Sequence, residues 1–179
     1  LLFPEFFSTL TGVIICVPIT ARISPISFSI SLCVRAHTVF ARYNAPCCLM
    51  HNKDNTEYNN FIVDMLAETQ ECVNIAKRAG IADDKIILDP GVGFGKTYEM
   101  NLMTMDNLEL FRKLGYPVLL GTSRKSMIGL ALDLPVDQRV EGTLATSVIG
   151  VMKGCAFVRV HDIKENKRVI QMTEAILGR

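Results

Sequence analysis

The stretch IILDPGVGFGKT at residues 86–97 decides the fold of this 179-residue chain. Lys85–Asp89 (KIILD) is a short apolar run with the length of a buried strand. Pro90 and Gly91 close the strand, further glycines follow, and residues 100–114 have helical spacing. A strand, a glycine-rich turn and a helix together predict one βα unit.

The same unit recurs along the chain from Tyr43 onward. The other strand candidates are Pro46–His51, Pro117–Gly121 and Ala156–Val160, and the other helical patterns are Thr56–Ala79, Ser126–Leu132, Val140–Lys153 and Lys164–Leu177. Four strands with helical crossovers predict an α/β fold with a parallel sheet. The strands are apolar throughout, which is typical of strands covered on both faces. Four units are half of a TIM (β/α)8 barrel, so we expect a partial barrel.

The composition changes sharply near residue 42. Residues 1–42 contain a single acid, Glu5, whereas residues 43–179 hold 17 of the 18 acids and 16 of the 19 basic residues. We therefore expect an irregular apolar segment at 1–42 and a separate unit at 43–179. The apolar run at 6–21 is short for a membrane span and contains a proline, so membrane association is not expected. The alternation of Ser with larger apolar residues at 23–32 is strand-like.

Charge and cysteine content limit the function classes. The net charge is +1, which argues against nucleic acid as a partner but leaves a small anionic ligand open. The six cysteines form no Cys-x-x-Cys pair, which is typical of reduced thiols in the cytoplasm. We expect Cys47 and Cys48 to be buried thiols, with a reactive or metal-binding role as the alternative.

The glycine-rich segment DPGVGFGKT (89–97) does not match a known phosphate loop. A Walker A loop requires glycine where this chain has Pro90, and the dinucleotide pattern requires glycine where it has Lys96. The glycines have a purely structural interpretation, a tight turn from strand to helix. Asp89 has two possible interpretations: it is a ligand-binding carboxylate, or it caps the loop by accepting from backbone amides.

Two further motifs follow strands. GTSRKS (121–126) places two cations before a helix, which indicates either an anion site or a capped helix with solvated cations. In RVHD (159–162), Arg159 and His161 have the same parity, so a strand would point both to one face. Asp162 either orients His161 or caps the last helix. A lone His51 at a strand end is more often structural.

Five motifs in order carry a resemblance to dihydropteroate synthases. They are NAPCCLMH, IILDPGVGFGKT, YPVLLGTSRKSMIG, EGTLAT and FVRVHDI, between residues 44 and 163. The chain resembles this family from about residue 40 to its end, the part that forms strands five to eight of the barrel. The resemblance implies condensation of 6-hydroxymethyl-7,8-dihydropterin pyrophosphate with 4-aminobenzoate to 7,8-dihydropteroate and pyrophosphate, within folate biosynthesis.

The resemblance also implies roles for individual residues. Asp89 matches the carboxylate that accepts hydrogen bonds from the pterin, and Lys125 the lysine that contacts the pterin ring. Arg159 and His161 match a pair near the pyrophosphate and the pterin face. The remaining positions expected to line the substrates are Met50, Phe94, Gly121, Ser123, Arg124 and Ser126.

The family's first half supplies a metal-ligating Asn and part of the pterin pocket, and residues 1–42 contain no such motif. The resemblance thus implies Mg²⁺ as a cofactor, but its usual Asn ligand is absent from this chain. No residue is therefore assigned as a metal ligand. We expect small-molecule substrates and a homodimer as partners. The alternatives are a pterin-binding methyltransferase domain, a non-catalytic pterin-binding half-barrel, and a phosphate-loop nucleotidase, which Pro90 disfavours.

Overall fold

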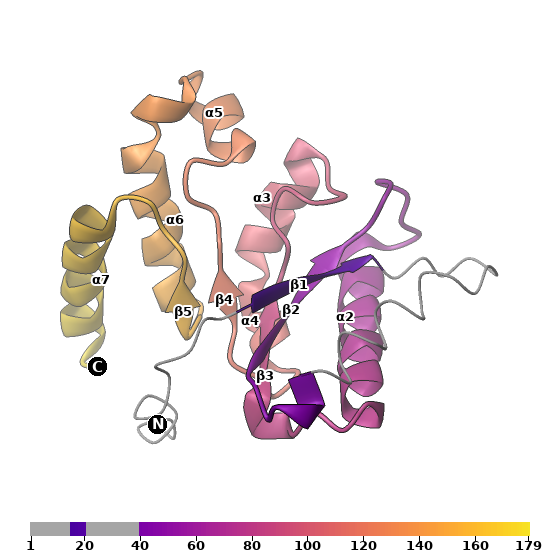
Figure 1. Ribbon diagram of the computed structural model, residues 1–179. Coiled ribbons are helices and arrows are strands. Elements are labelled where there is room, and N and C mark those ends of the chain that lie inside the picture. The colour runs from indigo at the N-terminus through magenta and orange to yellow at the C-terminus, as the bar shows by residue number, and fades with distance from the viewer. Residues whose placement is uncertain (1–14, 21–39) are drawn as a thin grey trace.

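The computed structural model describes the backbone of residues 15–20 and all of residues 40–179 (Figure 1). Within those ranges the strands are β1 (Ile15–Thr20), β2 (Cys47–Asn52), β3 (Ile86–Asp89), β4 (Leu119–Leu120) and β5 (Phe157–Val158). β1, β2 and β3 pair in that order, β4 pairs with β5, and every pairing is parallel. A parallel bridge between Leu88 and Val118 joins the two groups. The described strands therefore lie in chain order, and helices connect β2 to β3, β3 to β4 and β4 to β5.

Helices form the crossovers and confirm the predicted alternation. They are α2 (Phe61–Arg78), α3 (Tyr98–Asp106), α4 (Leu108–Arg112), α5 (Ser126–Leu132), α6 (Val140–Met152) and α7 (Ile163–Leu177). The helix predicted over residues 100–114 is two helices, α3 and α4, which meet at Asn107. In Figure 1 the helices succeed one another along the sheet, from α2 at the right to α7 at the left.

Both faces of β2 are buried. Cys47 and Leu49 belong to one apolar cluster, together with residues of α2 and β3. Cys48 packs on the opposite face with Ile87 and Leu119. All of these side chains are at most 7% exposed, which confirms the prediction of a strand covered on two sides.

The first helix starts later than the spacing predicted. We expected it from Thr56, but α2 begins at Phe61 because a polar cap fixes the chain just before it. The Asn60 side chain accepts from the Val63 amide at 3.4 Å, and Asp64 accepts from the Asn60 amide at 3.1 Å. Such caps satisfy amide groups that have no partner within the helix.

Part of the N-terminal segment is regular, contrary to our expectation for residues 1–42. Ile15–Thr20 forms β1 and pairs in parallel with β2, from Ile15 opposite Cys47 to Thr20 opposite Asn52. The physical reason is that β2 offers a free row of backbone groups, and β-branched residues favour the extended state. Pro18 is tolerated there, since proline can occupy an edge strand. The strand-like alternation at 23–32 lies outside the described residues.

Two sequence predictions concern membranes and thiols. Among the described residues, no helix is long and apolar enough to cross a membrane. Of the apolar run at 6–21, the description covers only residues 15–20. Cys47 and Cys48 are fully buried, as predicted, and burial raises the pKa of Cys47 to about 11.

Candidate active site

The polar residues singled out from the sequence gather where strands end. Met50 and His51 lie near the end of β2, and Asp89 is the last residue of β3. The segments 121–126 and 159–162 follow β4 and β5 directly. Because the strands are parallel, these positions share one end of the sheet, the end that carries active sites in α/β barrels.

Asp89 is a buried carboxylate at the centre of this end. Its side chain is 7% exposed and accepts from the Gly91 amide at 2.8 Å. Met50 lies opposite it in the β2–β3 register and is also buried. Burial raises the pKa of Asp89, while the Gly91 amide and the nearby charges of Lys125, Lys96 and Arg159 act to lower it. The residue therefore combines a loop-capping bond with a charge that is costly to bury.

Gly121 leaves room beside this carboxylate. A Cβ added to Gly121 would lie 3.9 Å from Oδ2 of Asp89. The Asp89 oxygen that does not bond Gly91 thus borders a position without a side chain. A flat ligand with hydrogen-bond donors on one edge suits such an acceptor.

The glycine-rich loop is packed directly on the backbone of β2 and its following loop. Gly91 and Gly95 have positive φ values of 65° and 58°. A Cβ at Gly91 would overlap the His51 carbonyl oxygen, and one at Gly95 would overlap the Lys53 carbonyl. The structural interpretation of these glycines is therefore correct: they permit both the turn and the close approach.

Lys125 reaches from the loop after β4 to the glycine-rich loop. Its Nζ donates to the Val92 carbonyl and lies 4.6 Å from the centre of the Phe94 ring. Its Cδ would lie 3.3 Å from a Cβ added to Gly93, so the lysine stem lies across that glycine. Phe94 itself is 41% exposed. The structure thus brings together three residues that the sequence singled out, namely Asp89, Phe94 and Lys125.

The loops after β4 and β5 are joined by two polar contacts. Ser123 Oγ lies 2.9 Å from His161 Nδ1 and accepts from the His161 amide at 3.1 Å. Arg124 donates twice to Asp162, at 2.6 Å from Nη2 and 3.2 Å from Nε. Arg124 has a φ of 58°, so this ion pair helps to hold an uncommon backbone conformation.

These contacts correct two predictions about the RVHD segment. Asp162 binds Arg124 instead of orienting His161, and its side chain makes no capping bond to α7. Arg159 and His161 lie beyond the end of β5, so strand alternation does not apply to them. Both are exposed, as is Ser126 at the start of α5.

Several residues that hold the loops of the site through hydrogen bonds were not predicted from the sequence. Lys96 donates to three acceptors, and Glu68 binds His51, of which only His51 had been singled out. Asn101, 4% exposed, accepts from the Gly93 amide at 2.6 Å. Arg139 donates to the Arg124 carbonyl at 3.0 Å. The one sequence signal for these residues was the position of Lys96 within the glycine-rich loop. The phosphate-loop patterns do not assign that lysine a role in holding the loop.

Residues 29–161 match the family model described as pterin binding enzyme. That range is well over half of the chain, so the chain belongs to the pterin-binding enzyme family. Its likeness to solved members gives it a TIM-barrel-type α/β fold.

Within that family, the chain resembles dihydropteroate synthases. It is 66% identical over 142 residues to the dihydropteroate synthase of Clostridium beijerinckii, covering 79% of this chain and 53% of the relative. It is 51% identical to that of Bacillus subtilis over 142 residues, covering 79% and 50%. The crystal structure of the Clostridium difficile dihydropteroate synthase in the presence of pteroic acid matches with a TM-score of 0.78 and 42% identity, over 80% of this chain and 55% of that one. The chain thus spans about half the length of the curated relatives it matches.

Proposed function

We propose that this chain contributes the second half of a dihydropteroate synthase barrel. In this proposal residues 43–179 supply strands five to eight, and residues 1–42 are a segment of separate character. The reaction joins 6-hydroxymethyl-7,8-dihydropterin pyrophosphate to 4-aminobenzoate. Pyrophosphate leaves with the electron pair of the C–O bond, the amine nitrogen attacks the cationic methylene, and the amine then releases one proton.

The observation that carries the proposal is the buried Asp89 carboxylate beside Gly121. A fully buried carboxylate is costly, and its raised pKa records that cost. A ligand with two donors on one edge, as in the amino-pyrimidine edge of a pterin, removes that cost by bonding the carboxylate. Asp89 is therefore assigned to the pterin, with Met50 and Gly121 as its pocket walls.

The cations around this carboxylate are assigned to the reacting groups. Lys125 lies across the glycine-rich loop above Phe94, where it can contact the pterin ring. Arg159 and His161 are assigned to the departing pyrophosphate, because fixed cations stabilise developing negative charge. Phe94 and Ser126 are assigned to 4-aminobenzoate.

The contacts of Arg124 with Asp162 and of Ser123 with His161 suggest that Arg124 and Ser123 have a supporting role. Arg124 is engaged by Asp162, and Ser123 lies against His161. We assign Ser123 and Arg124 to the substrate pocket as residues that fix the loop bearing Lys125 and the position of His161. Their side chains hold the two loops together, and the Arg124 backbone is itself bonded to Thr143 and Arg139.

Magnesium enters only as a property expected of the family. Among the residues that the structure describes, no three His, Cys, Asp or Glu side chains gather to hold a metal ion. None of the steps above is assigned to a metal.

Turnover tests the proposal directly. The chain is incubated with the dihydropterin pyrophosphate, labelled 4-aminobenzoate and Mg²⁺, and dihydropteroate is measured. We expect product that is lost in Lys125→Ala and kept in Lys113→Ala, an exposed lysine at the C-cap of α4, before β4 begins. Pterin binding without turnover would assign this chain a binding role only, and absence of both would refute the proposal.

Two broader expectations remain part of the proposal, a cytoplasmic location and a homodimer. Support for self-association comes from large apolar side chains exposed on α7, with Met172 at 59% and Ile176 at 73%. Sedimentation at several concentrations tests the dimer, and a monomer at all of them would contradict it.

A further inference from the structure

Lys96 is a half-buried lysine inside the glycine-rich loop that the proposed reaction does not use. Its Nζ donates to the Gly91 carbonyl at 3.0 Å and to the Phe94 carbonyl at 3.0 Å. The third contact is to Nδ1 of His51 at 2.9 Å. An ammonium group has three N–H donors, so each of them has an acceptor. The lysine thus closes the loop on itself and fastens it to the end of β2.

His51 continues this contact to α2. Its Nε2 lies 2.8 Å from Oε2 of Glu68. Because Nδ1 accepts from Lys96, Nε2 must carry the ring proton and donate to Glu68. Burial lowers the pKa of His51, which favours this neutral ring at pH 7.

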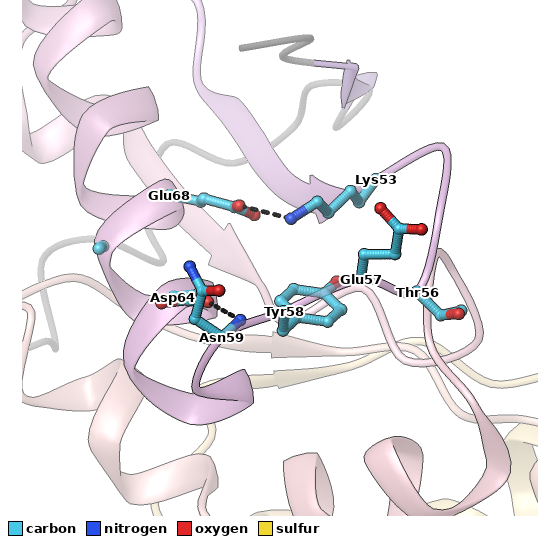
Figure 2. Close-up of a pocket in the computed structure, with 8 residues that line it drawn as sticks. Lys53, Thr56, Glu57, Tyr58, Asn59, Asp64 and Glu68 are labelled. Carbon is cyan, nitrogen blue, oxygen red and sulfur yellow. Dashed lines mark hydrogen bonds and ion pairs between the residues drawn. The ribbon is translucent and has the colours of Figure 1, made fainter.

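Glu68 is where the network meets solvent. Its Oε1 accepts from Lys53 Nζ at 3.0 Å, and Lys53 lies 4.3 Å from the centre of the Tyr58 ring. Glu68, Lys53 and Tyr58 line an open cavity beside the loop after β2, where the two charged side chains point toward each other (Figure 2). Tyr58 also donates to the Gly95 carbonyl at 2.9 Å. The cavity wall is therefore tied to the glycine-rich loop.

The loop that Lys96 closes supports Lys125. The Val92 carbonyl accepts from Lys125, and the Phe94 ring lies under the Lys125 ammonium. Lys96 binds the carbonyls of Gly91 and Phe94. Val92 lies between these two residues in the chain, and Phe94 is the second of them. A change at Lys96 must therefore move the surface on which Lys125 rests.

We propose that Lys96 is a positioning residue: with His51 and Glu68 it holds the glycine-rich loop in the shape that places Lys125 and Phe94 for pterin binding. This inference rests on the proposed function for its ligand. The loop contacts themselves do not depend on that function, so the two can fail separately.

The charge state of Lys96 gives the network a pH dependence. The pKa of Lys96 is lowered to about 7, chiefly by burial and also by the like charge of Lys125, while Asp89 and Glu68 act to raise it. His51 is the remaining titratable group in contact with it, and Lys53 faces it through Glu68. A neutral amine has two N–H donors, so one of the three contacts is lost as pH rises through about 7. Pterin affinity is then expected to fall over the same range.

Three variants of the whole chain test the proposal. Lys96→Met removes all three donors, Glu68→Gln keeps an acceptor for His51 but removes the charge, and Lys113→Met is an exposed control. Affinity for pteroic acid is measured by calorimetry between pH 6 and 8.5. Hydrogen exchange is followed at the Gly91, Gly93 and Phe94 amides, which have acceptors in Asp89, Asn101 and Gly91.

We expect Lys96→Met to weaken pteroic acid binding about tenfold and to speed exchange of the three loop amides, since bonds to a charged group are among the stronger ones. Glu68→Gln should shift the fall in affinity to lower pH, because the Glu68 charge raises the pKa of Lys96. Lys113→Met should change neither quantity.

Unchanged affinity and unchanged exchange in Lys96→Met would overturn the proposal. If that variant does not fold, Glu68→Gln decides: an unmoved pH profile overturns the proposal, and a profile moved to lower pH supports it. If the unsubstituted chain does not bind pteroic acid, the proposed function fails, and exchange at the loop amides alone then decides whether Lys96 holds the loop.

Discussion

Asp89→Asn separates what the Asp89 carboxylate does for the ligand from what it does for the fold. The substitution keeps the size of the side chain and keeps an oxygen to accept from the Gly91 amide. It removes the negative charge from a side chain that is 7% exposed. If Asp89 serves the ligand, affinity and stability must therefore change in opposite directions.

The stability effect follows from the direction of the pKa shift. Burial raises the pKa of Asp89 in the folded chain above its unfolded value. The folded state then holds the proton more tightly than the unfolded state, so the charge opposes folding increasingly as pH rises through the folded pKa, and this cost is absent in acid, below the unfolded pKa. Removing the charge should therefore raise the free energy of unfolding, and with it Tm, at pH values above the folded pKa. The gain should vanish in acid.

The affinity effect has the opposite sign. An amide offers one acceptor and one donor, so a pterin edge with two donors loses one bond to a charged group and meets a donor instead. Bonds to charged groups contribute about 1.5–3 kcal/mol, so affinity for pteroic acid should fall about 10- to 150-fold. Calorimetry and thermal unfolding of Asp89→Asn are compared with Asp84→Asn, an exposed aspartate. A variant that is less stable than this control and binds as tightly as the parent would refute the reasoning, since the charge would then be structural.

Three further substitutions test the geometry of the site. Gly91→Ala should lower the free energy of unfolding by about 3 kcal/mol in chemical denaturation, because its Cβ overlaps a backbone oxygen of β2 at a positive φ. Arg124→Met should raise the pKa of Asp162, which Arg124 now lowers, and so remove the stability that is lost as pH falls through that pKa; a titration by NMR measures it. Gly121→Ala should fold normally, since its Cβ meets Asp89 at 3.9 Å, yet bind pteroic acid about tenfold more weakly in calorimetry; equal affinity would place the ligand elsewhere.

The strand and helix pattern was predictable because burial imposes it on the sequence. The run at 86–89 is a strand because both of its faces are covered, and its four residues are all buried. Helix boundaries were less predictable, since a local polar cap such as Asn60 decides them. β1 was missed because its strand character depends on a partner, β2, that is distant in the sequence.

In the candidate site, too, some residues could be predicted from the sequence and others could not. Asp89 could be found because a charged residue at the end of an apolar strand is unusual, and Lys125 because its motif places cations before a helix. The contact between Lys96 and His51 joins residues 45 positions apart, and no local pattern encodes it. Likewise, the ion pair of Arg124 with Asp162 spans two loops that only the sheet brings together.

The cations near Asp89 have different tasks, and their surroundings decide which. Lys96 is bound by loop carbonyls, and Lys125 lies on the same loop across Phe94. These two lysines therefore shape the glycine-rich loop beside Asp89, and their charges lower the cost of burying the Asp89 carboxylate. Arg159 also lowers the pKa of Asp89, but its side chain is exposed. An exposed guanidinium within the field of a buried acid suits an arriving and departing anion, because it can bind in water and release again. Under the proposed function, these fixed lysines would hold the neutral pterin ring, and the accessible arginine would bind and release pyrophosphate.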